Sequence, residues 1–196
     1  MSNLSCLELF TGAGGLAKGL DMAGIQHKAF VEWNKDACKT LANNYVNHLV
    51  HNVDIRTFKF EQFKFVDMVV GGPPCQPFSM GGKHGGNMDQ RDMFPYACKA
   101  INICKPKAFI FENVKGILRK SFSSYFEYII LRLTYPEISC GSSESWKDHL
   151  ARLEKIHTSG KYHGVKYKVI FRLLDAANYG VPQRRERVFI IGIRED

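Results

Sequence analysis

The chain has 196 residues, 45% of them hydrophobic, and a formal net charge of +8, as in a soluble single-domain protein with either a polyanionic partner or a merely basic surface. Its apolar runs are strand-sized and no basic segment precedes the first of them, which argues against a membrane span and a signal peptide and predicts a cytoplasmic protein. The six cysteines form no C-x-x-C pair and the seven histidines no H-E-x-x-H motif, so the spacing indicates neither a zinc site nor a disulfide framework, and no metal is expected.

Strands and helices are expected to alternate along most of the chain. Gly24 is expected to end the first helix, and Asn34 to cap the second. The predicted strands are 4–10, 28–32, a short strand before Asp54, 66–70 and 108–111, and the predicted helices are 16–23, 34–45 and 93–103. This alternation predicts an α/β fold with a mostly parallel sheet.

The C-terminal third is less regular. Two last strands, 167–174 and 187–193, flank the polar segment 178–186 and are expected to form an antiparallel hairpin. The stretch 135–164 is polar and rich in Ser, His and Lys, and we expect a helix there with flexible flanks.

A glycine-rich loop follows the first predicted strand. Phe10-Thr-Gly-Ala-Gly-Gly15 ends that strand, and Glu32 ends the next one, 20 residues beyond Gly12 (32 − 12). In nucleotide-binding α/β folds, glycines at this place let the backbone approach the ligand, and an acid at this offset accepts hydrogen bonds from ribose hydroxyls. The loop alone fits a nicotinamide-dependent oxidoreductase equally well, and it also fits a plain tight turn.

A proline-rich loop follows the predicted strand at 66–70. Its sequence is Gly71-Gly-Pro-Pro-Cys-Gln-Pro-Phe-Ser79. The two prolines fix φ and remove backbone donors directly before Cys75, at a strand end of the kind where open α/β sheets bind ligands. The pattern therefore favours a nucleophilic thiol at Cys75 over a buried, inert one.

Two further polar segments stand near strand ends. Glu112 follows an apolar strand and is expected at the same edge of the sheet as Cys75, where its carboxyl group could hold or deliver a proton. Arg185 and Arg187 would share one face of an extended segment and suit a phosphate or a polarised carbonyl. Taken alone, Glu112 fits a helix N-terminal charge as well, and the arginines fit a solvated basic turn.

The ordered set of motifs resembles the DNA cytosine-C5 methyltransferases of bacteria and phages. The matching segments are Phe10-x-Gly-x-Gly14, Glu32-Trp33, Pro73-Pro-Cys-Gln76, Glu112-Asn-Val114 and Gln183-Arg-Arg-Glu-Arg187. The resemblance implies a Rossmann-like, S-adenosylmethionine-dependent methyltransferase fold. It also implies methyl transfer from S-adenosylmethionine to carbon 5 of cytosine in duplex DNA.

The resemblance further implies the roles of individual residues. Cys75 would be the nucleophile and Glu112 would contact the cytosine edge. Arg185 and Arg187 would anchor the base carbonyl and support the active-site loop. The S-adenosylmethionine site would be lined by Phe10, Gly12, Gly14, Glu32, Trp33, Asp54, Ile55, Pro74 and Phe94.

Stacked neighbours cover the reacting faces of a paired cytosine, so the base must swing out of the duplex. We therefore expect a lid at 80–90, where glycines surround Lys83 and His84, to close over the DNA. Gln76 and Ser79 are expected to belong to the same DNA-facing loop.

Members of this family normally continue past the Gln-Arg-Arg-Glu-Arg segment with a target-recognition domain and two further motifs. We expect residues 1–196 to form one catalytic and cofactor-binding domain. Target recognition would come from a second polypeptide or a missing C-terminal segment, with little activity in its absence. Two rival functions stay open: a tRNA cytosine methyltransferase with a similar Pro-Pro-Cys loop, and a non-catalytic subunit of a split methyltransferase.

Overall fold

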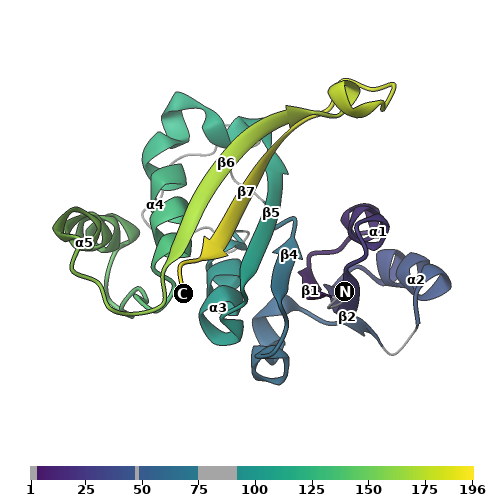
Figure 1. The fold of residues 1–196 in the computed structure, drawn as a ribbon, viewed down its shortest axis with the longest axis horizontal. Coiled ribbons are helices and arrows are strands. Elements are labelled where there is room, and N and C mark those ends of the chain that lie inside the picture. Colours follow the sequence, from purple (N-terminus) through teal and green to yellow (C-terminus); the bar gives the residue numbers. More distant parts are fainter. Residues whose placement is uncertain (1–3, 47–48, 75–91) are drawn as a thin grey trace.

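The computed structural model of the chain describes residues 4–46, 49–74 and 92–196. In these residues, strands form one sheet in the order β3-β2-β1-β4-β5-β7-β6 (Figure 1). The strands are β1 Ser5–Leu9, β2 Gln26–Glu32, β3 Val50–Asn52, β4 Met68–Gly71, β5 Ala108–Val114, β6 Tyr167–Asp175 and β7 Glu186–Arg194. The α-helices are α1 Gly15–Met22, α2 Lys35–Asn44, α3 Phe94–Cys104, α4 Ser123–Thr134 and α5 Trp146–Ser159.

The direction of the strands confirms the expected α/β fold. β1 is parallel to β2 and β4, β2 to β3, and β4 to β5. Among the strands described, only β7 runs the other way, because it is antiparallel to both β5 and β6. The tip of the β6–β7 hairpin projects beyond the rest of the sheet (Figure 1).

Helices pack on both faces of the sheet, as the period of two along each strand requires. On one face, Leu20 of α1 packs against alternate residues of β1 and β4, including Cys6 and Val70. On the other face, α3 and α4 cover Leu7, Val69, Phe109 and Ile190, which belong to the largest core cluster. In Figure 1, α1 and α2 accordingly lie beside β1 and β2, and α3 and α4 lie with the other half of the sheet.

The predicted local signals at the first helices are confirmed. Asn34 caps α2, since its side-chain oxygen accepts hydrogen bonds from the backbone N–H groups of Asp36 and Ala37. Gly24 follows α1 with a φ of +76°, in the left-handed region that glycine adopts without steric cost.

Two features of the second half were not predicted from the sequence. No element was assigned to 123–134, where α4 forms, because aromatic and β-branched residues there obscure the helical period. Tertiary packing stabilises the helix, because Phe126, Ile129 and Leu133 lie on one side of α4 and are buried in the core. The expected strand at 108–111 also continues to Val114, because β7 pairs with it along its whole length.

The polar stretch 135–164 contains the expected helix. Ser145 caps α5 by accepting the N–H of Asp148, and Gly160 ends the helix with a φ of +64°. Among the described residues, no helix is both long enough and apolar enough to cross a membrane.

Candidate active site

The ends of β1 and β4 lie at one edge of the sheet, beside the second half of β5. The pairing register places Leu9 beside Gly71, Gly71 beside Phe111, and Phe111 beside Ile190. The glycine loop after β1, the start of the proline loop after β4, and the last residues of β5 therefore lie next to one another. This is the edge at which open α/β sheets bind their ligands.

The glycine loop turns sharply through left-handed backbone conformations. Phe10, Gly12 and Gly14 have φ values of +55°, +58° and +94°. A side chain at Gly14 would place its Cβ 3.0 Å from Cδ2 of Leu41, whereas no atom lies within 4 Å of a Cβ built at Gly12. Glycine is therefore needed at Gly14 for packing, and the backbone at Gly12 is open to an approaching ligand.

Glu32 holds this loop in place. Its Oε2 accepts the backbone N–H of Gly12 at 2.8 Å, and its Oε1 accepts that of Asn34 at 2.8 Å. The residue is only 8% exposed, so the two hydrogen bonds compensate for burying the carboxylate. Each oxygen keeps a second lone pair, which leaves acceptor capacity for a hydroxyl group.

The other expected cofactor residues differ in how much surface they present. Trp33 is 74% exposed beside Glu32, and Pro74 is also exposed. Ile55 and Phe94 are 6% and 1% exposed and belong to the main core cluster, so Phe94 offers almost no surface to a ligand. Asp54 forms an ion pair and hydrogen bonds with Arg56, which hold the pKa of its carboxyl group below the usual range.

The proline loop is anchored to β5 just before Cys75. A Cβ at Gly71 would lie 2.2 Å from the carbonyl oxygen of Leu9, so only glycine lets β4 end this close to β1. The side-chain amide of Asn113 donates a hydrogen bond of 3.0 Å to the carbonyl oxygen of Pro73. Asn113 is 3% exposed. Asn113 is not among the site residues predicted from the sequence, although it lies within the Glu112-Asn-Val114 motif.

Several expected site residues lie outside the described part of the chain. They are Cys75, Gln76, Ser79, Lys83, His84 and the expected lid at 80–90.

Glu112 and Arg187 form an ion pair at the same edge. Nε of Arg187 lies 2.9 Å from Oε1 of Glu112, and the two side chains are 23% and 28% exposed. Arg187 is held further by a hydrogen bond from its Nη1 to the carbonyl oxygen of Glu186. Gly72 adjoins the carboxylate, because a Cβ built there would lie 3.7 Å from Oε2 of Glu112. The arrangement leaves a carboxylate and a guanidinium group side by side and accessible from the proline loop.

Arg185 is not part of this ion pair. It precedes β7 and is exposed, and its backbone N–H donates to Oδ1 of Asp175 at 2.9 Å. Its guanidinium group has no hydrogen-bond or ion-pair partner among the residues of known position.

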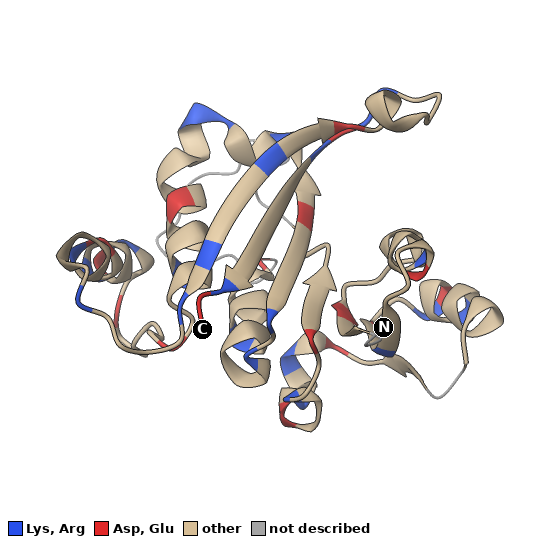
Figure 2. Cartoon of the chain, in the orientation of Figure 1, with Lys and Arg blue, Asp and Glu red and all other residues tan. Residues whose placement is uncertain are grey.

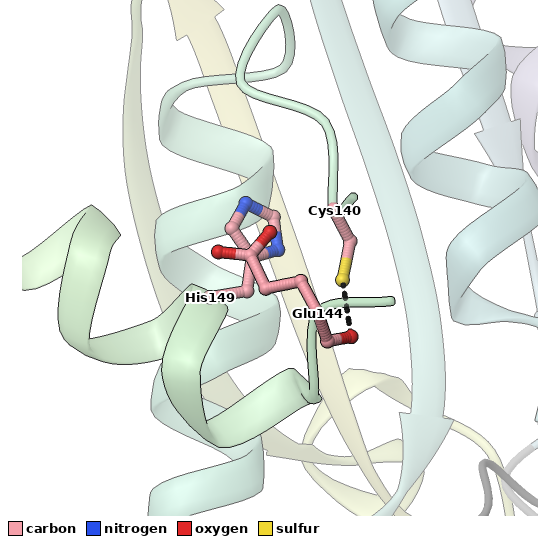
Figure 3. Close-up of side chains that lie close together, drawn as sticks. All are labelled: Cys140, Glu144 and His149. Carbon is pink, nitrogen blue, oxygen red and sulfur yellow. Dashed lines mark hydrogen bonds between the residues drawn. The ribbon is translucent and has the colours of Figure 1, made fainter. Parts of the chain in front are cut away.

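A second group of chemically reactive side chains lies between α4 and α5. Cys140, Glu144 and His149 place their ligand-type atoms within 4.8 Å of one another (Figure 3). These atoms are already engaged: both ring nitrogens of His149 contact Tyr128 and Ile138, and Glu144 pairs with Arg152. Burial and the nearby arginines also lower the pKa of His149 to about 4. The group is therefore a hydrogen-bonded support for the α4–α5 connection rather than a site suited to a cation.

Comparison with known proteins identifies the family. The family model described as C-5 cytosine-specific DNA methylase matches residues 4–135 and 147–196. The type II methyltransferase M.NgoMIV of Neisseria gonorrhoeae is 34% identical over 190 residues, covering 97% of this chain and 52% of that protein. M.AquIA of Picosynechococcus is 35% identical over 197 residues, covering 96% of this chain and 71% of that protein.

Solved structures agree with this assignment. A prophage-encoded DNA modification methyltransferase from E. coli superimposes with a TM-score of 0.69 at 26% identity, covering 98% of this chain and 47% of that one. The Dnmt2 structure from Spodoptera frugiperda, at 22% identity and a TM-score of 0.64, shares the fold. The chain thus spans about half the length of several of its relatives. It belongs to the C-5 cytosine-specific DNA methylase family.

Proposed function

We propose that this chain transfers a methyl group from S-adenosylmethionine to carbon 5 of cytosine in duplex DNA, with Cys75 as the nucleophile. The observation that carries the proposal is the Glu112–Arg187 ion pair beside the anchored start of the Pro73-Pro74-Cys75 loop. Membership of the methylase family supports the same chemistry. We further propose that residues 1–196 form one catalytic and cofactor-binding domain.

The glycine loop and its neighbours suit the methyl donor. The uncovered backbone at Gly12 and the remaining acceptor capacity of Glu32 fit a nucleoside with ribose hydroxyls. Exposed Trp33 offers a flat face for a ring. When bound, S-adenosylmethionine supplies an electrophilic methyl group on a sulfonium. We propose that it is held by Phe10, Gly12, Gly14, Glu32, Trp33, Asp54, Ile55 and Pro74, with Phe94 supporting the site from the core.

The protein's own groups must first make carbon 5 nucleophilic. The Cys75 thiolate adds to carbon 6 of the cytosine, forming the S–C6 bond and moving the C5–C6 electron pair toward carbon 5. Glu112 in its carboxyl form gives its proton to ring N3 and becomes the carboxylate that pairs with Arg187, while Arg187, with Arg185, stabilises the charge that develops on O2. The observed pairing of Glu112 with Arg187 would hold both side chains at the same edge of the cytosine ring, where N3 and O2 are neighbours.

The adduct must then collapse to product. Carbon 5 takes the methyl group as the sulfonium S–CH3 bond breaks, with that electron pair staying on sulfur. Carbon 5 then loses its proton to a base, the electron pair re-forms the C5–C6 double bond, the Cys75 thiolate leaves, and N3 returns its proton to Glu112. Asn113 would position the nucleophile throughout, because it binds the Pro73 carbonyl two residues before Cys75.

DNA must present the cytosine outside the duplex for this chemistry. We propose that Gln76, Ser79, Lys83 and His84 belong to a loop that contacts the DNA around the extruded base. We also propose that target recognition resides in polypeptide beyond these 196 residues, as another chain or a further segment.

Transfer of a radiolabelled methyl group tests the proposed function. The protein is incubated with labelled S-adenosylmethionine and either mixed-sequence duplex DNA or total tRNA. In DNA we expect a low level of label that rises when the polypeptide carrying target recognition is added and that survives digestion to nucleosides as 5-methylcytosine. Label in tRNA alone would show that the substrate is RNA and not DNA. Label in neither substrate, with no trapping on 5-fluorocytosine DNA even when that polypeptide is present, would favour a non-catalytic subunit.

A further inference from the structure

A basic pocket lies beside the Glu112–Arg187 ion pair. It has a volume of about 480 Å³ and lies between the turn that follows β5 and the residues that lead into β7. The turn is a 3-10 helix, Lys115–Leu118. The pocket is lined by Val114, Lys115, Gly116, Arg119 and residues 183–187.

Positive charge in this pocket exceeds negative charge. Its lining contains five cationic side chains and one acid, Glu186. Lys115 pairs with Glu186 and Arg187 pairs with Glu112, so these two cations are compensated. Arg119 and Arg184 are exposed and have no acidic partner within the described ranges, and the same holds for Arg185. Figure 2 shows further Lys and Arg residues along the β6–β7 hairpin, with acidic residues where the two strands approach the tip.

The two walls of the pocket are held at a fixed separation by the sheet. Val114, the last residue of β5, pairs with Arg187 near the start of β7. The turn is closed by a hydrogen bond of 3.2 Å from the Arg119 N–H to the carbonyl oxygen of Gly116. On the opposite wall, Asp175 holds the Arg185 N–H. The guanidinium groups are therefore carried by backbone that is already ordered.

These features match a phosphate group. Guanidinium groups bind phosphate oxygens through paired, charge-assisted hydrogen bonds, and uncompensated cations gain most from such a ligand. Glu112 and Val114 are two residues apart on β5, so their side chains lie on the same face of the strand. Because Val114 lines the pocket, the pocket adjoins the proposed base site at Glu112. The phosphates that flank an extruded nucleotide must lie within one nucleotide of its base.

We propose that Arg119 and Arg184 bind a backbone phosphate of the DNA strand whose cytosine is extruded. The inference rests on the proposed function and adds a substrate contact to it. The bound phosphate fixes the strand beside Glu112, so the contact contributes to DNA affinity and leaves cofactor affinity unchanged. It carries no base specificity, because phosphate contacts are the same at every sequence.

Salt dependence of DNA binding tests this inference directly. The full chain, R119A, R184A and the double variant are titrated against a fluorescent duplex with one cytosine opposite an abasic position, at a series of salt concentrations. Each lost phosphate contact lowers the slope of log affinity against log salt by about 0.9. The exposed Lys155 on α5 provides the matched control, since K155A removes one charge far from the pocket.

The expected result is a smaller slope and weaker duplex binding in R119A and R184A, with the slope of K155A and all affinities for S-adenosylmethionine unchanged. R119K, which keeps the charge, should restore part of the slope. An unchanged slope in the double variant, while the unsubstituted chain binds duplex and is trapped on 5-fluorocytosine DNA, would overturn this inference alone. Absence of both binding and trapping in the unsubstituted chain would overturn the proposed function as well. If the substitutions lower the salt-dependence slope for tRNA binding but not for duplex DNA binding, the inferred contact with a DNA phosphate would also be contradicted.

Discussion

Arg187 and Glu112 lie on neighbouring antiparallel strands, with Nε and Oε1 2.9 Å apart. The ion pair sets the Glu112 carboxylate at the edge where the proline loop leaves β4. Its partial exposure matters for the proposed function, because a substrate ring could reach these two side chains only if they are not fully buried. The proposed chemistry depends on this accessibility.

Replacing Glu112 by Gln should lower methyl transfer by about 10²- to 10⁴-fold, because an amide cannot deliver a proton to N3. Affinity for S-adenosylmethionine should not change, since Glu112 lies outside the glycine loop. Single-turnover methylation and calorimetric cofactor titration measure the two effects. E127Q, which changes an exposed acid on α4, is the control. Normal turnover in E112Q would remove Glu112 from the proposed mechanism.

Replacing Glu32 by Ala should weaken cofactor binding by at least about tenfold, since it frees the N–H groups of Gly12 and Asn34, and a hydrogen bond to a charged group contributes about 1.5–3 kcal/mol. Isothermal titration with S-adenosylmethionine checks this. E154A on the exposed side of α5 should bind as the unsubstituted protein does. Equal affinity in E32A and E154A would show that the loop does not depend on Glu32.

Replacing Asn113 by Ala should slow adduct formation by leaving the Pro73 carbonyl without its donor. It should also cost about 1–3 kcal/mol of unfolding free energy, as expected for a buried polar group left unpaired. Trapping rates at saturating cofactor, together with urea denaturation, separate the two effects. N44A, at an exposed position of α2, serves as the comparison. If N113A loses stability but traps at the normal rate, Asn113 has only a structural role.

Glu8 should make stability fall as pH rises. It is fully buried in β1, neither carboxylate oxygen has a hydrogen-bond partner among the described residues, and burial, with a contribution from Asp21, raises its pKa to about 8. The folded protein therefore keeps a proton that the unfolded chain loses above about pH 4.5. Protonated Glu8 therefore contributes to the unfolding free energy in full below about pH 4.5, and this contribution is lost as pH rises through about 8.

The neighbours of Glu8 define the useful pH window. His27 lies 3.6 Å away and its pKa is lowered from 6.5 by burial, so it destabilises the fold only at lower pH. Burial raises the pKa of Cys6 to about 12, which matters only above pH 9. Between pH 6.5 and 8, unfolding free energy should drop by about 1 kcal/mol per pH unit, and E8Q should abolish the drop. A flat profile in the unsubstituted protein would contradict the assignment.

Local signals in the sequence predicted much of the fold. Asn34 and Gly24 delimit helices through backbone chemistry that acts within a few residues. By contrast, α4 forms because Phe126 and Ile129 are buried against the sheet, and that burial depends on strands distant in sequence. The end of β5 could not be predicted for the same reason: pairing with β7, which is distant in sequence, extends the strand to Val114.

The candidate site shows the same division. The motifs predicted the site residues, and the structure shows that neighbouring strands bring Glu112 close to the described start of the proline loop, residues 71–74. The contact of Glu112 with Arg187 depends on an antiparallel register that no local pattern encodes. The Asn113–Pro73 and Glu32–Gly12 hydrogen bonds likewise join segments 40 and 20 residues apart.

The most direct test of the central claim is to map the covalent adduct formed on 5-fluorocytosine DNA in the presence of S-adenosylmethionine. Fluorine replaces the proton that must leave carbon 5, so the enzyme should remain bonded to the base. We predict a denaturation-resistant complex whose DNA-linked peptide contains Cys75, and none with C75S. An adduct that persists in C75S, or one attached to a different residue, would contradict the account.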